Sequence, residues 1–268
     1  MVIVVKVGGS LLKLGPPENI VQDFVKMLEE DKLVLVHGGG YEVTEMAERL
    51  GKKQKFVVSP DGIRSRYTDK ETVEIYTMVM KGKINSEIVL ALQAKGVRAV
   101  GISGFDGSTL VAERKKRLVI VDERGRKVAI DGGYTGKIVK ANSELLNTLL
   151  EKNFVPIVAP VALGTEGEML NVDGDRAAAA IAGCLKAEKT IFLTDVGGVI
   201  IDGQLIKEMS VEEARKSLRK VGFGMDKKIM AAVEAIENGA RESIISAGNI
   251  ENPLTNSLLG ENRTVIKP

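Results

Sequence analysis

The sequence predicts an α/β fold with a largely parallel sheet, and two early segments of the chain carry that prediction. Residues 2–5 and 33–37 are short aliphatic runs of the kind that form strands buried on both faces. A glycine-rich loop follows each run, and apolar residues at helical spacing follow each loop. This repeated order of strand, loop and helix is typical of parallel strands joined by crossover helices, whose loops share one edge of the sheet.

The rest of the chain continues the alternation of strands and helices. Helices are expected over residues 43–50, 69–95 and 222–239, with a possible break at Gly82 in the second. Further helices are expected to begin after Pro17, Asn142, Arg176 and Ser210, where Ser210 and Glu213 form a capping box. Strands are expected over residues 97–103, 154–160, 190–194, 244–246 and 264–266, with a hairpin over 118–130 and a loop or hairpin over 56–68. The pattern contains no linker, so any boundary between two lobes must lie inside it, within residues 170–185.

Composition and charge exclude several classes of protein. With 268 residues and a formal net charge of +2, the chain is long enough for two compact lobes and has no overall charge that favours nucleic acid. It contains no apolar run approaching the ~18–20 residues of a membrane span, and its start lacks a signal peptide. The single cysteine, Cys184, excludes an internal disulfide, and its apolar neighbours favour a core position over a nucleophile. We therefore expect a cytoplasmic protein without a membrane or nucleic-acid partner.

Lys6 is the first residue that suggests a function. It ends a predicted buried strand, where a lysine is costly to bury unless it meets an anion, and it is followed by Gly8 and Gly9. Backbone N–H groups of such a loop can face phosphate oxygens, although a lysine at a sheet edge beside an ordinary turn would leave the same pattern. The loop of residues 38–40 ends the second strand, and two such loops are expected to converge on one crevice. The only histidine, His37, is expected to be structural.

The other candidate residues fit phosphoryl transfer. The sequence has no Ser/His/Asp set, no metal-ligand cluster of Cys and His, and no P-loop motif. Lysines and backbone donors suit a reaction in which the protein positions and neutralises a travelling phosphoryl group. Lys6 and Lys228 could contact the phosphates of a nucleotide from opposite sides, with Asp175 holding both ammonium groups. A carboxylate acceptor would need no general base, and Arg66 could hold a second carboxylate in a forked pair. Each residue alone could be an ordinary ion-pairing residue, but their joint placement at loop starts favours a site.

Six motifs distributed along the chain resemble those of the amino acid kinase family, in its N-acetylglutamate kinase branch. They are KVGGS at 6–10, HGGG at 37–40, RYTD at 66–69, NVDGD at 171–175, TDVGGV at 194–199 and GMDKK at 224–228. The resemblance covers the whole chain. It implies an open αβα sandwich around a mostly parallel sheet of about eight strands. It also implies that residues 1–175 form the acyl-substrate lobe, which dimerises, and that residues 176–268 form the ATP-binding lobe.

The resemblance further implies a role for each matched residue. Lys6 and Lys228 match lysines that stabilise the phosphates, and Asp175 matches the aspartate that organises them. The residues implied to bind ATP are Lys6, Gly8, Gly9, Ser10, Asp195, Gly197, Gly224, Met225 and Lys228. Those implied to bind the acyl substrate are Gly38, Gly39, Gly40, Arg66 and Asn171. ATP is the implied phosphoryl donor, with Mg²⁺ held mainly by nucleotide phosphates and water and by no protein ligand.

Two departures from ordinary N-acetylglutamate kinases change this expectation. The usual G-x-R-V-T-D motif is here two residues longer, between Gly62 and Asp69, so Arg64 is an alternative to Arg66 for the carboxylate. A basic stretch precedes the segment GGYTGK, and this combination resembles archaeal and thermophilic kinases whose substrate is 2-aminoadipate or glutamate bound to a small acidic amino-group carrier protein. Such a stretch would attract an acidic carrier, whereas composition alone would make it a solvated charged strand. The candidate docking residues are Arg114, Lys115, Lys116, Arg117, Arg124, Arg126 and Lys127.

Three functions stay open at this point. The first is ATP-dependent phosphorylation of the side-chain carboxylate of carrier-bound aminoadipate or glutamate, in lysine and possible arginine biosynthesis. The second is phosphorylation of free N-acetylglutamate in arginine biosynthesis, and the third is a nucleotide-sensing module that binds ATP without turnover. Aminoadipate and glutamate differ by one methylene, which a hydrophobic pocket distinguishes by only ~1–3 kcal/mol. The resemblance also implies a homodimer formed through the helix after Asp69.

Overall fold

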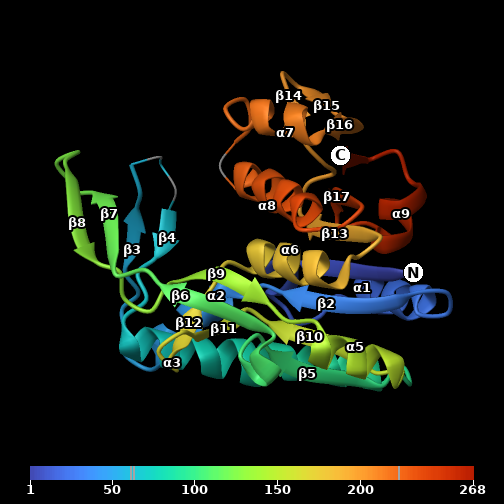
Figure 1. The fold of residues 1–268 in the computed structure, drawn as a ribbon, viewed down its shortest axis with the longest axis horizontal. Coiled ribbons are helices and arrows are strands. Elements are labelled where there is room, and N and C mark those ends of the chain that lie inside the picture. The colour runs from blue at the N-terminus through green and yellow to red at the C-terminus, as the bar shows by residue number, and fades with distance from the viewer. Residues whose placement is uncertain (61, 63, 223) are drawn as a thin grey trace.

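One eight-stranded sheet forms the centre of the molecule (Figure 1). The structure is a computed structural model that describes residues 1–60, 62, 64–222 and 224–268, so Asp61, Ile63 and Phe223 of the segments discussed above lie outside the described residues. All neighbouring strands in this sheet are parallel except β17 and β18, which confirms the expected mostly parallel sheet. In spatial order the strands are β16 (Glu208–Ser210), β18 (Arg263–Lys267), β17 (Glu242–Ala247), β13 (Lys189–Thr194), β1 (Val2–Val7), β2 (Lys32–His37), β10 (Val155–Ala159) and β5 (Ala99–Ser103).

Helices cover both faces of the sheet. They are η1 (Gly9–Leu12), α1 (Glu18–Met27), α2 (Gly40–Arg49), α3 (Lys70–Thr77), the π-helical segment η2 (Met78–Ile84), α4 (Asn85–Gln93), η3 (Asp106–Ser108), α5 (Glu144–Glu151), α6 (Gly174–Leu185), α7 (Val211–Ser217), α8 (Met225–Glu237) and α9 (Pro253–Leu259). Alternate strand residues point to opposite faces, so Val4 and Val36 join one buried cluster with α5, α6 and α8. Val5 and Leu35 join the other cluster, with α1, α2 and the α3–α4 run. This arrangement is the expected αβα sandwich.

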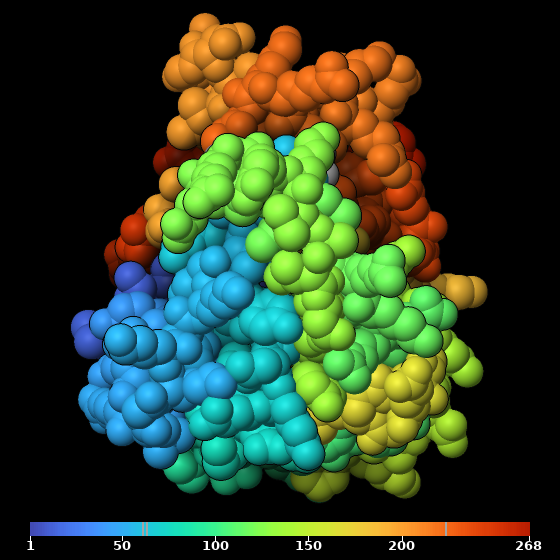
Figure 2. Space-filling model, turned by 90° about the vertical axis from the view of Figure 1, so that its left-hand side faces the viewer, coloured from blue at the N-terminus to red at the C-terminus, as the bar shows by residue number. Residues whose placement is uncertain are grey.

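A second sheet and three hairpins lie outside the central sheet. The second sheet, which the sequence did not predict, has the order β12 (Met169–Asn171), β11 (Val161–Gly164), β6 (Leu110–Arg114) and β9 (Gly136–Ala141). The hairpins are β3 (Phe56–Val58) with β4 (Arg64–Arg66), β7 (Arg117–Val121) with β8 (Lys127–Asp131), and β14 (Ile200–Ile201) with β15 (Gln204–Leu205). The first two hairpins project side by side from one end of the molecule (Figure 1). In Figure 2 the light-green β7–β8 segment lies across that end, between the blue-to-cyan lower part and the orange C-terminal part.

The long helix expected over residues 69–95 is one helical run without a break at Gly82. Asp69 caps it, because the Asp69 carboxylate accepts a hydrogen bond from the Thr72 nitrogen at 2.8 Å. Gly82 lies inside η2, which joins α3 directly to α4. A π-helical turn widens the helix instead of ending it, and such turns are frequent at functional sites.

Several smaller expectations can also be compared with the structure. Ser210 and Glu213 form the capping box of α7, and the Asn142 side chain accepts a hydrogen bond from the Glu144 nitrogen at 3.1 Å. The strand expected to begin at residue 97 begins instead at Ala99. Helix α6 spans the region in which the boundary was placed, and the division into lobes of residues 1–175 and 176–268 stays a prediction. In the described part of the chain, no helix is both long enough and apolar enough to cross a bilayer.

Candidate active site

Two glycine loops touch at the carboxyl ends of β1 and β2. These strands are parallel neighbours, and their last residues, Val7 and His37, are paired. A Cβ atom on Gly9 would lie 2.7 Å from the Gly39 nitrogen, and a Cβ atom on Gly38 would lie 2.7 Å from the Gly9 nitrogen. Because neither position has room for a side chain, the two backbones meet directly. Helices η1 and α2 begin at these loops, where the first N–H groups have no intrahelical acceptor, so the junction presents backbone donors suited to an anion.

Lys6, Asp175 and Lys228 form a buried cluster at the same edge of the sheet. Lys6 Nζ lies 2.6 Å from Asp175 Oδ1, and Lys228 Nζ lies 3.2 Å from Asp175 Oδ2. The exposed fractions of the three side chains are 7% for Lys6, 9% for Asp175 and 17% for Lys228. Lys6 comes from β1, whereas Asp175 and Lys228 come from the first turns of α6 and α8. The expected contact of one carboxylate with both lysines is therefore confirmed, and their catalytic role stays a prediction.

The charges in this cluster hold Asp175 in its ionised form. Burial alone would raise the pKa of Asp175, but the ammonium groups of Lys6 and Lys228 outweigh burial and keep that pKa below its usual range. The carboxylate is therefore negative at neutral pH and holds two positive charges beside each other. Such a pair of cations is suited to the oxygens of a transferring phosphoryl group.

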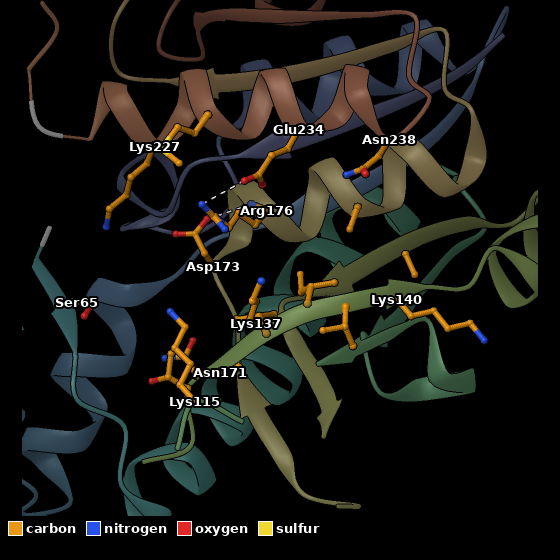
Figure 3. Close-up of a pocket in the computed structure, with 18 of the residues that line it drawn as sticks. Ser65, Lys115, Lys137, Lys140, Asn171, Asp173, Arg176, Lys227, Glu234 and Asn238 are labelled. Atoms are coloured by element: carbon orange, nitrogen blue, oxygen red, sulfur yellow. Dashed lines mark hydrogen bonds and ion pairs between the residues drawn. The ribbon is translucent and has the colours of Figure 1, made fainter. Parts of the chain in front are cut away.

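A basic cleft with a volume of about 910 Å³ opens beside the cluster. It lies between α6 and α8 on one side and β9 on the other (Figure 3). Asp173 and Lys227, which line it, are close in sequence to Asp175 and Lys228. The lining has a formal net charge of +4, whereas the whole chain carries +2. It contains six basic and two acidic side chains, which are Arg66, Lys115, Lys137, Lys140, Arg176, Lys227, Asp173 and Glu234.

Three motifs that are far apart in the sequence interlock at this cleft. The Tyr134 nitrogen donates to the Thr68 carbonyl at 2.6 Å, and the Asn171 nitrogen donates to the Tyr134 carbonyl at 2.9 Å. The Asn171 side-chain nitrogen also donates to the Thr68 hydroxyl at 2.9 Å. Asn171 lines the cleft while Thr68 is fully buried behind it. The predicted substrate residue Asn171 is thus held by contacts from both other motifs.

Arg66 and Arg64, the two candidates for binding a carboxylate, both stack on the Phe56 ring but differ in their other contacts. Arg66 lines the cleft, and its Nη2 atom donates to the Gly40 carbonyl at 2.6 Å and to the Thr44 hydroxyl at 2.8 Å. The guanidinium of Arg64 is exposed and stacks on the Phe56 ring, with 4.1 Å from its central carbon to the ring centroid. Of the two, only Arg66 contacts the glycine loop that contains Gly40. Which of them binds substrate stays a prediction.

The remaining residues predicted to bind ATP lie on loops at the same edge of the sheet. The Gly8 nitrogen donates to the Leu193 carbonyl at 3.1 Å, which ties the end of β1 to the end of β13. The others are Ser10 in η1, Asp195 and Gly197 directly after β13, and Gly224 and Met225 at the start of α8. Topology therefore gathers this set along one edge, although the cleft lining itself does not include Lys6, Asp175 or Lys228 among the described residues.

The candidate docking residues do not all lie on one exposed surface. Arg114 is held within the fold, because its Nε atom donates to the Gly133 carbonyl at 2.5 Å and its guanidinium stacks on the Tyr134 ring. Arg126 pairs with Asp122 at 2.8 Å at the tip of the β7–β8 hairpin. Lys115 lines the cleft. Exposed positions on or next to the hairpin are occupied by Lys115, Lys116, Arg117, Arg124, Arg126 and Lys127.

His37 and Cys184 have the properties of structural residues. His37 is fully buried, and burial lowers the pKa of its ring to about 4, so the ring is neutral at pH 7. Cys184 is half-buried and lines the cleft, so the expected core position is wrong. Burial nevertheless raises the pKa of its thiol to about 11, which leaves little of the reactive thiolate at neutral pH.

Comparisons with known proteins agree with this architecture. The model of the family described as "Amino acid kinase family" matches residues 1–246. The chain belongs to the amino acid kinase family. This membership confirms the expected family and, together with the kinase names of the curated relatives, supports a phosphotransferase.

The curated relatives of this amino acid kinase match it over nearly its full length. A protein of Sulfolobus acidocaldarius named LysW-aminoadipate/LysW-glutamate kinase is 45% identical over 264 residues, covering 98% of this chain and 99% of that protein. A protein of Cenarchaeum symbiosum, which carries the same name provisionally, is 55% identical over 264 residues and 98% of each chain.

Solved structures resemble the same fold at lower identity. The N-acetylglutamate synthase of Neisseria gonorrhoeae superposes with a TM-score of 0.81 at 25% identity, and this chain covers 59% of that longer protein. The carbamate kinase of Giardia lamblia superposes with a TM-score of 0.67 at 18% identity, with 99% of this chain and 98% of that chain covered. These likenesses confirm the expected fold.

Sequence reasoning missed several residues of the cleft. Lys137, Lys140, Arg176, Lys227 and Glu234 line it, and none of them was predicted as a site residue. The sequence did carry a signal for Arg176. Asp173, Arg176 and Cys184 recur at helical spacing, so they lie on one face of α6, and that face lines the cleft. The lysines of β9 had no such signal, since that strand was not predicted.

Proposed function

We propose that this amino acid kinase transfers the γ-phosphoryl group of ATP to the side-chain carboxylate of L-2-aminoadipate, L-glutamate or both, each bound to a small acidic carrier protein. The observation that supports the proposal most directly is the cluster of Lys6, Asp175 and Lys228 beside a cleft with six basic and two acidic side chains. The names of relatives at 45% and 55% identity point to the same acceptors. The product is an acyl phosphate in lysine biosynthesis. We further propose that the enzyme also acts in arginine biosynthesis.

The chemistry requires little from the protein beyond position and charge. A carboxylate oxygen of the acceptor attacks the γ-phosphorus, the bond from that phosphorus to the β–γ bridging oxygen breaks, and ADP leaves with the electron pair. The acceptor is already ionised at neutral pH, so no general base is needed. Lys6 and Lys228 neutralise the charge that spreads over the phosphoryl oxygens. In this proposal residues 1–175 bind the acceptor and residues 176–268 bind ATP.

We also propose that Mg²⁺ is held mainly through ATP phosphates and water. Among the residues that the structure describes, no three or more His, Cys, Asp or Glu side chains are grouped so that they could hold a metal ion. A magnesium ion that keeps several waters and binds substrate phosphates needs few protein ligands. When bound, it would supply further positive charge to the phosphates.

Arg66→Ala should raise the KM for the acceptor about tenfold or more while kcat changes less, because a charge-assisted hydrogen bond to a carboxylate contributes about 1.5–3 kcal/mol. The matched control is Arg64→Ala, which removes an equal side chain that stacks on Phe56 outside the cleft. Steady-state kinetics with the carrier-bound acceptor measure both variants. The opposite ranking of the two KM values would assign the carboxylate to Arg64.

The carrier-docking part of the proposal rests on charge. Residues 113–131 contain seven basic and four acidic side chains, and the cleft beside them is more strongly basic. Because Lys115 belongs to both sets, the basic stretch adjoins the cleft, whose lining includes Asp173 and Lys227 next to Asp175 and Lys228 in the sequence. An acidic carrier would be attracted to these basic side chains, and salt would weaken that attraction.

Hydroxylamine trapping of the acyl phosphate tests the proposed function. The acceptors compared are free N-acetyl-L-glutamate and glutamate or 2-aminoadipate attached to the acidic carrier, each at low and at high salt. We expect strong activity with the carrier-bound acceptors only, with a kcat/KM that falls about tenfold or more between 50 and 500 mM salt, because both the steering and the screening are electrostatic. Equal activity with free N-acetylglutamate would make the chain an ordinary N-acetylglutamate kinase. ATP binding without transfer to any acceptor would make it a sensing module.

We further propose a homodimer formed through the helical run of α3, η2 and α4. Met78 and Leu90 on this run are exposed by 59% and 65%, which is more than usual for large apolar side chains. Sedimentation velocity tests this proposal, since the Leu90→Glu variant should sediment as a monomer. An unchanged sedimentation coefficient would remove this helix from any interface.

A further inference from the structure

The glycine loop of residues 38–40 rests on the π-helical segment η2. A Cβ atom on Gly39 would lie 2.0 Å from Ile84 Cδ1 and 2.9 Å from Met80 Sδ. Both of these side chains belong to η2, and both are buried. The loop therefore has no room to move towards the helical run. Asn85, the residue directly after the π turn, lies next to His37, the residue before the loop.

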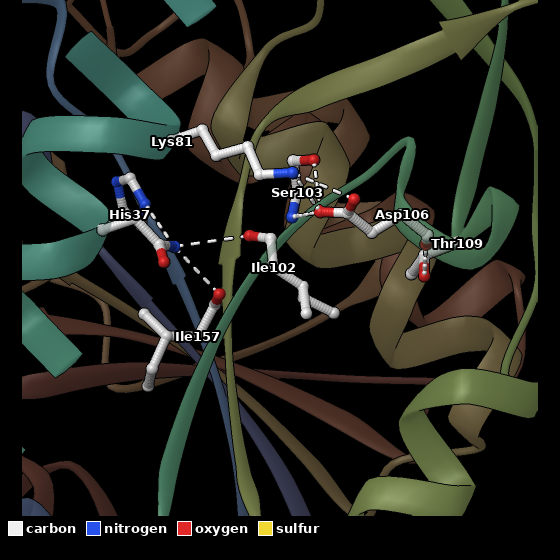
Figure 4. Close-up of polar contacts among 8 residues, drawn as sticks. His37, Lys81, Ile102, Ser103, Asp106, Thr109 and Ile157 are labelled. Carbon is white, nitrogen blue, oxygen red and sulfur yellow. Dashed lines mark hydrogen bonds and ion pairs between the residues drawn. The ribbon is translucent and has the colours of Figure 1, made fainter. Parts of the chain in front are cut away.

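Asn85 connects three strands of the central sheet. Its side-chain nitrogen lies 3.1 Å from His37 Nε2, 2.9 Å from the Ile157 carbonyl and 3.3 Å from the Ile102 carbonyl. Figure 4 labels the three partners His37, Ile157 and Ile102. These three acceptors belong to β2, β10 and β5. Asn85 is 2% exposed, and a Cβ atom on Gly101 would lie 2.0 Å from Asn85 Oδ1. The amide is thus enclosed, and its nitrogen is the side that faces the histidine.

This orientation selects one tautomer of His37. The NH₂ group of Asn85 has two hydrogens for these three acceptors, so one hydrogen is shared. An NH₂ group cannot itself accept a hydrogen bond, so the neutral His37 ring must face it with an unprotonated Nε2 and carry its proton on Nδ1. Nδ1 then donates to the Gly38 carbonyl at 3.1 Å. Because a trans peptide places its C=O and N–H on opposite sides, fixing the Gly38 carbonyl also fixes the Gly39 N–H. That nitrogen lies at the junction of the two glycine loops, 2.7 Å from the place that a Cβ atom on Gly9 would take.

We infer that Asn85 is a positioning residue for phosphoryl transfer, which acts through the Nδ1–H tautomer of His37 to aim the Gly39 N–H at the acceptor or its phosphoryl group. The inference rests on the proposed function for the identity of the reaction, but its structural half concerns a tautomer that can be observed directly. Burial and, to a lesser extent, the charge of Lys6 lower the pKa of the His37 ring. The Lys81–Asp106 pair, 2.7 Å apart, is the other charged group drawn with His37 in Figure 4.

Asn85→Asp tests the inference because it keeps the size of the side chain and removes the N–H donors. Above pH 7 the new carboxylate accepts a hydrogen bond from His37 Nε2–H, so the neutral ring changes to the Nε2–H tautomer and loses the Nδ1–H that it donates to the Gly38 carbonyl. We expect kcat to fall about a hundredfold at pH 8, the usual cost of misplacing a reacting group by about 1 Å, with the KM for ATP within about threefold. Activity should recover as the pH falls towards 6, because an imidazolium held by the carboxylate regains Nδ1–H.

Gln93→Glu is the matched control. Gln93 lies at the other end of α4, and its side-chain nitrogen donates to the Ala99 carbonyl of β5 at 3.1 Å. The same change from amide to carboxylate is made on the same helix and strand, away from the glycine loops. It should leave kcat and its pH profile unchanged, and thermal unfolding of both variants reports any loss of folding.

Nitrogen-15 NMR supplies a readout that does not depend on activity. His37 is the only histidine, so its two ring nitrogens need no assignment to residue. We expect the neutral Nδ1–H tautomer in the wild type from pH 5 to 8 and a ring that titrates at higher pH in Asn85→Asp. A wild-type ring in the Nε2–H form would overturn the inference, as would an Asn85→Asp variant with a wild-type pH profile for kcat. A wild type that forms no acyl phosphate would instead contradict the proposed function, while the tautomer could still be observed.

Discussion

Asp175→Asn is expected to lower kcat for acyl-phosphate formation by about a thousandfold, the upper end of what a single electrostatic group contributes. Asp175 is the only carboxylate in contact with both Lys6 and Lys228 among the described residues, at 2.6 and 3.2 Å. Without its charge, the two buried ammonium groups repel each other and leave the positions in which they would meet the phosphates. The hydroxylamine assay measures the loss.

The same variant should also be less stable in the absence of ATP. Removing one partner from a buried ion pair costs about 3–5 kcal/mol of folding free energy, because the remaining charge stays buried. ATP should raise the melting temperature of Asp175→Asn more than that of the wild type, since phosphates would supply the missing negative charge. The pKa of Asp175 is below its unfolded value of about 3.9, so its contribution to stability is complete well above pH 4 and is lost as the pH falls through the native pKa. Assays at pH 7–8 therefore compare a charged residue with a neutral one.

Glu242→Gln is the control for Asp175→Asn. Glu242 forms an ion pair with Lys189, and the two residues face each other at the amino ends of β17 and β13, the opposite edge of the same sheet. This variant loses a half-buried pair without changing the candidate site, so its kcat should stay near that of the wild type. A near-wild-type kcat for Asp175→Asn would mean that the cluster is not the centre of the reaction.

Lys6→Ala and Lys228→Ala should each lower kcat by about 10²–10³-fold, with the KM of the acceptor changed by less than about threefold. Both lysines are largely buried and share one carboxylate, so their charges act where water screens them little. An interaction made mainly in the transition state affects kcat, whereas one made equally with bound substrate affects KM. Steady-state kinetics of each variant measure the two constants separately.

The double variant gives a second check on the lysines. Two groups that stabilise the same phosphoryl charge act as a unit, so the combined loss should be smaller than the product of the single losses. Lys189→Ala, which removes a lysine from the opposite edge of the sheet, is the control and should keep normal turnover. Normal turnover in Lys6→Ala or in Lys228→Ala would remove that residue from the mechanism.

The sequence by itself determined the sheet and the composition of the cluster. Buried strands such as residues 2–7 and 32–37 are recognisable because a strand covered on both faces must be apolar along its whole length. Lys6 stood out for the same reason, since a charge in such a run needs a partner. The parallel order of strands then predicted that the loops at one edge would meet, and Gly9 and Gly39 do meet there.

Only the tertiary structure decided which cations surround the cleft. Lys137 and Lys140 lie on β9, a strand of the second sheet whose pairing with β6 is a long-range contact that local periodicity does not encode. Arg114 belongs to the basic stretch by sequence, but stacking on Tyr134 holds it within the fold. The position of a charged side chain depends on which distant backbone groups and rings it reaches, and those neighbours exist only after the sheets have formed.

The tertiary structure also decided the role of the helix after Asp69. Sequence periodicity predicted the helical run but treated Gly82 as a possible break, because glycine is a poor helix former. The π turn at this point places Ile84 against Gly39 and Asn85 against His37. Helical periodicity depends on local spacing alone, whereas a single extra residue in one turn rotates everything that follows, and packing against the glycine loop selects that rotation.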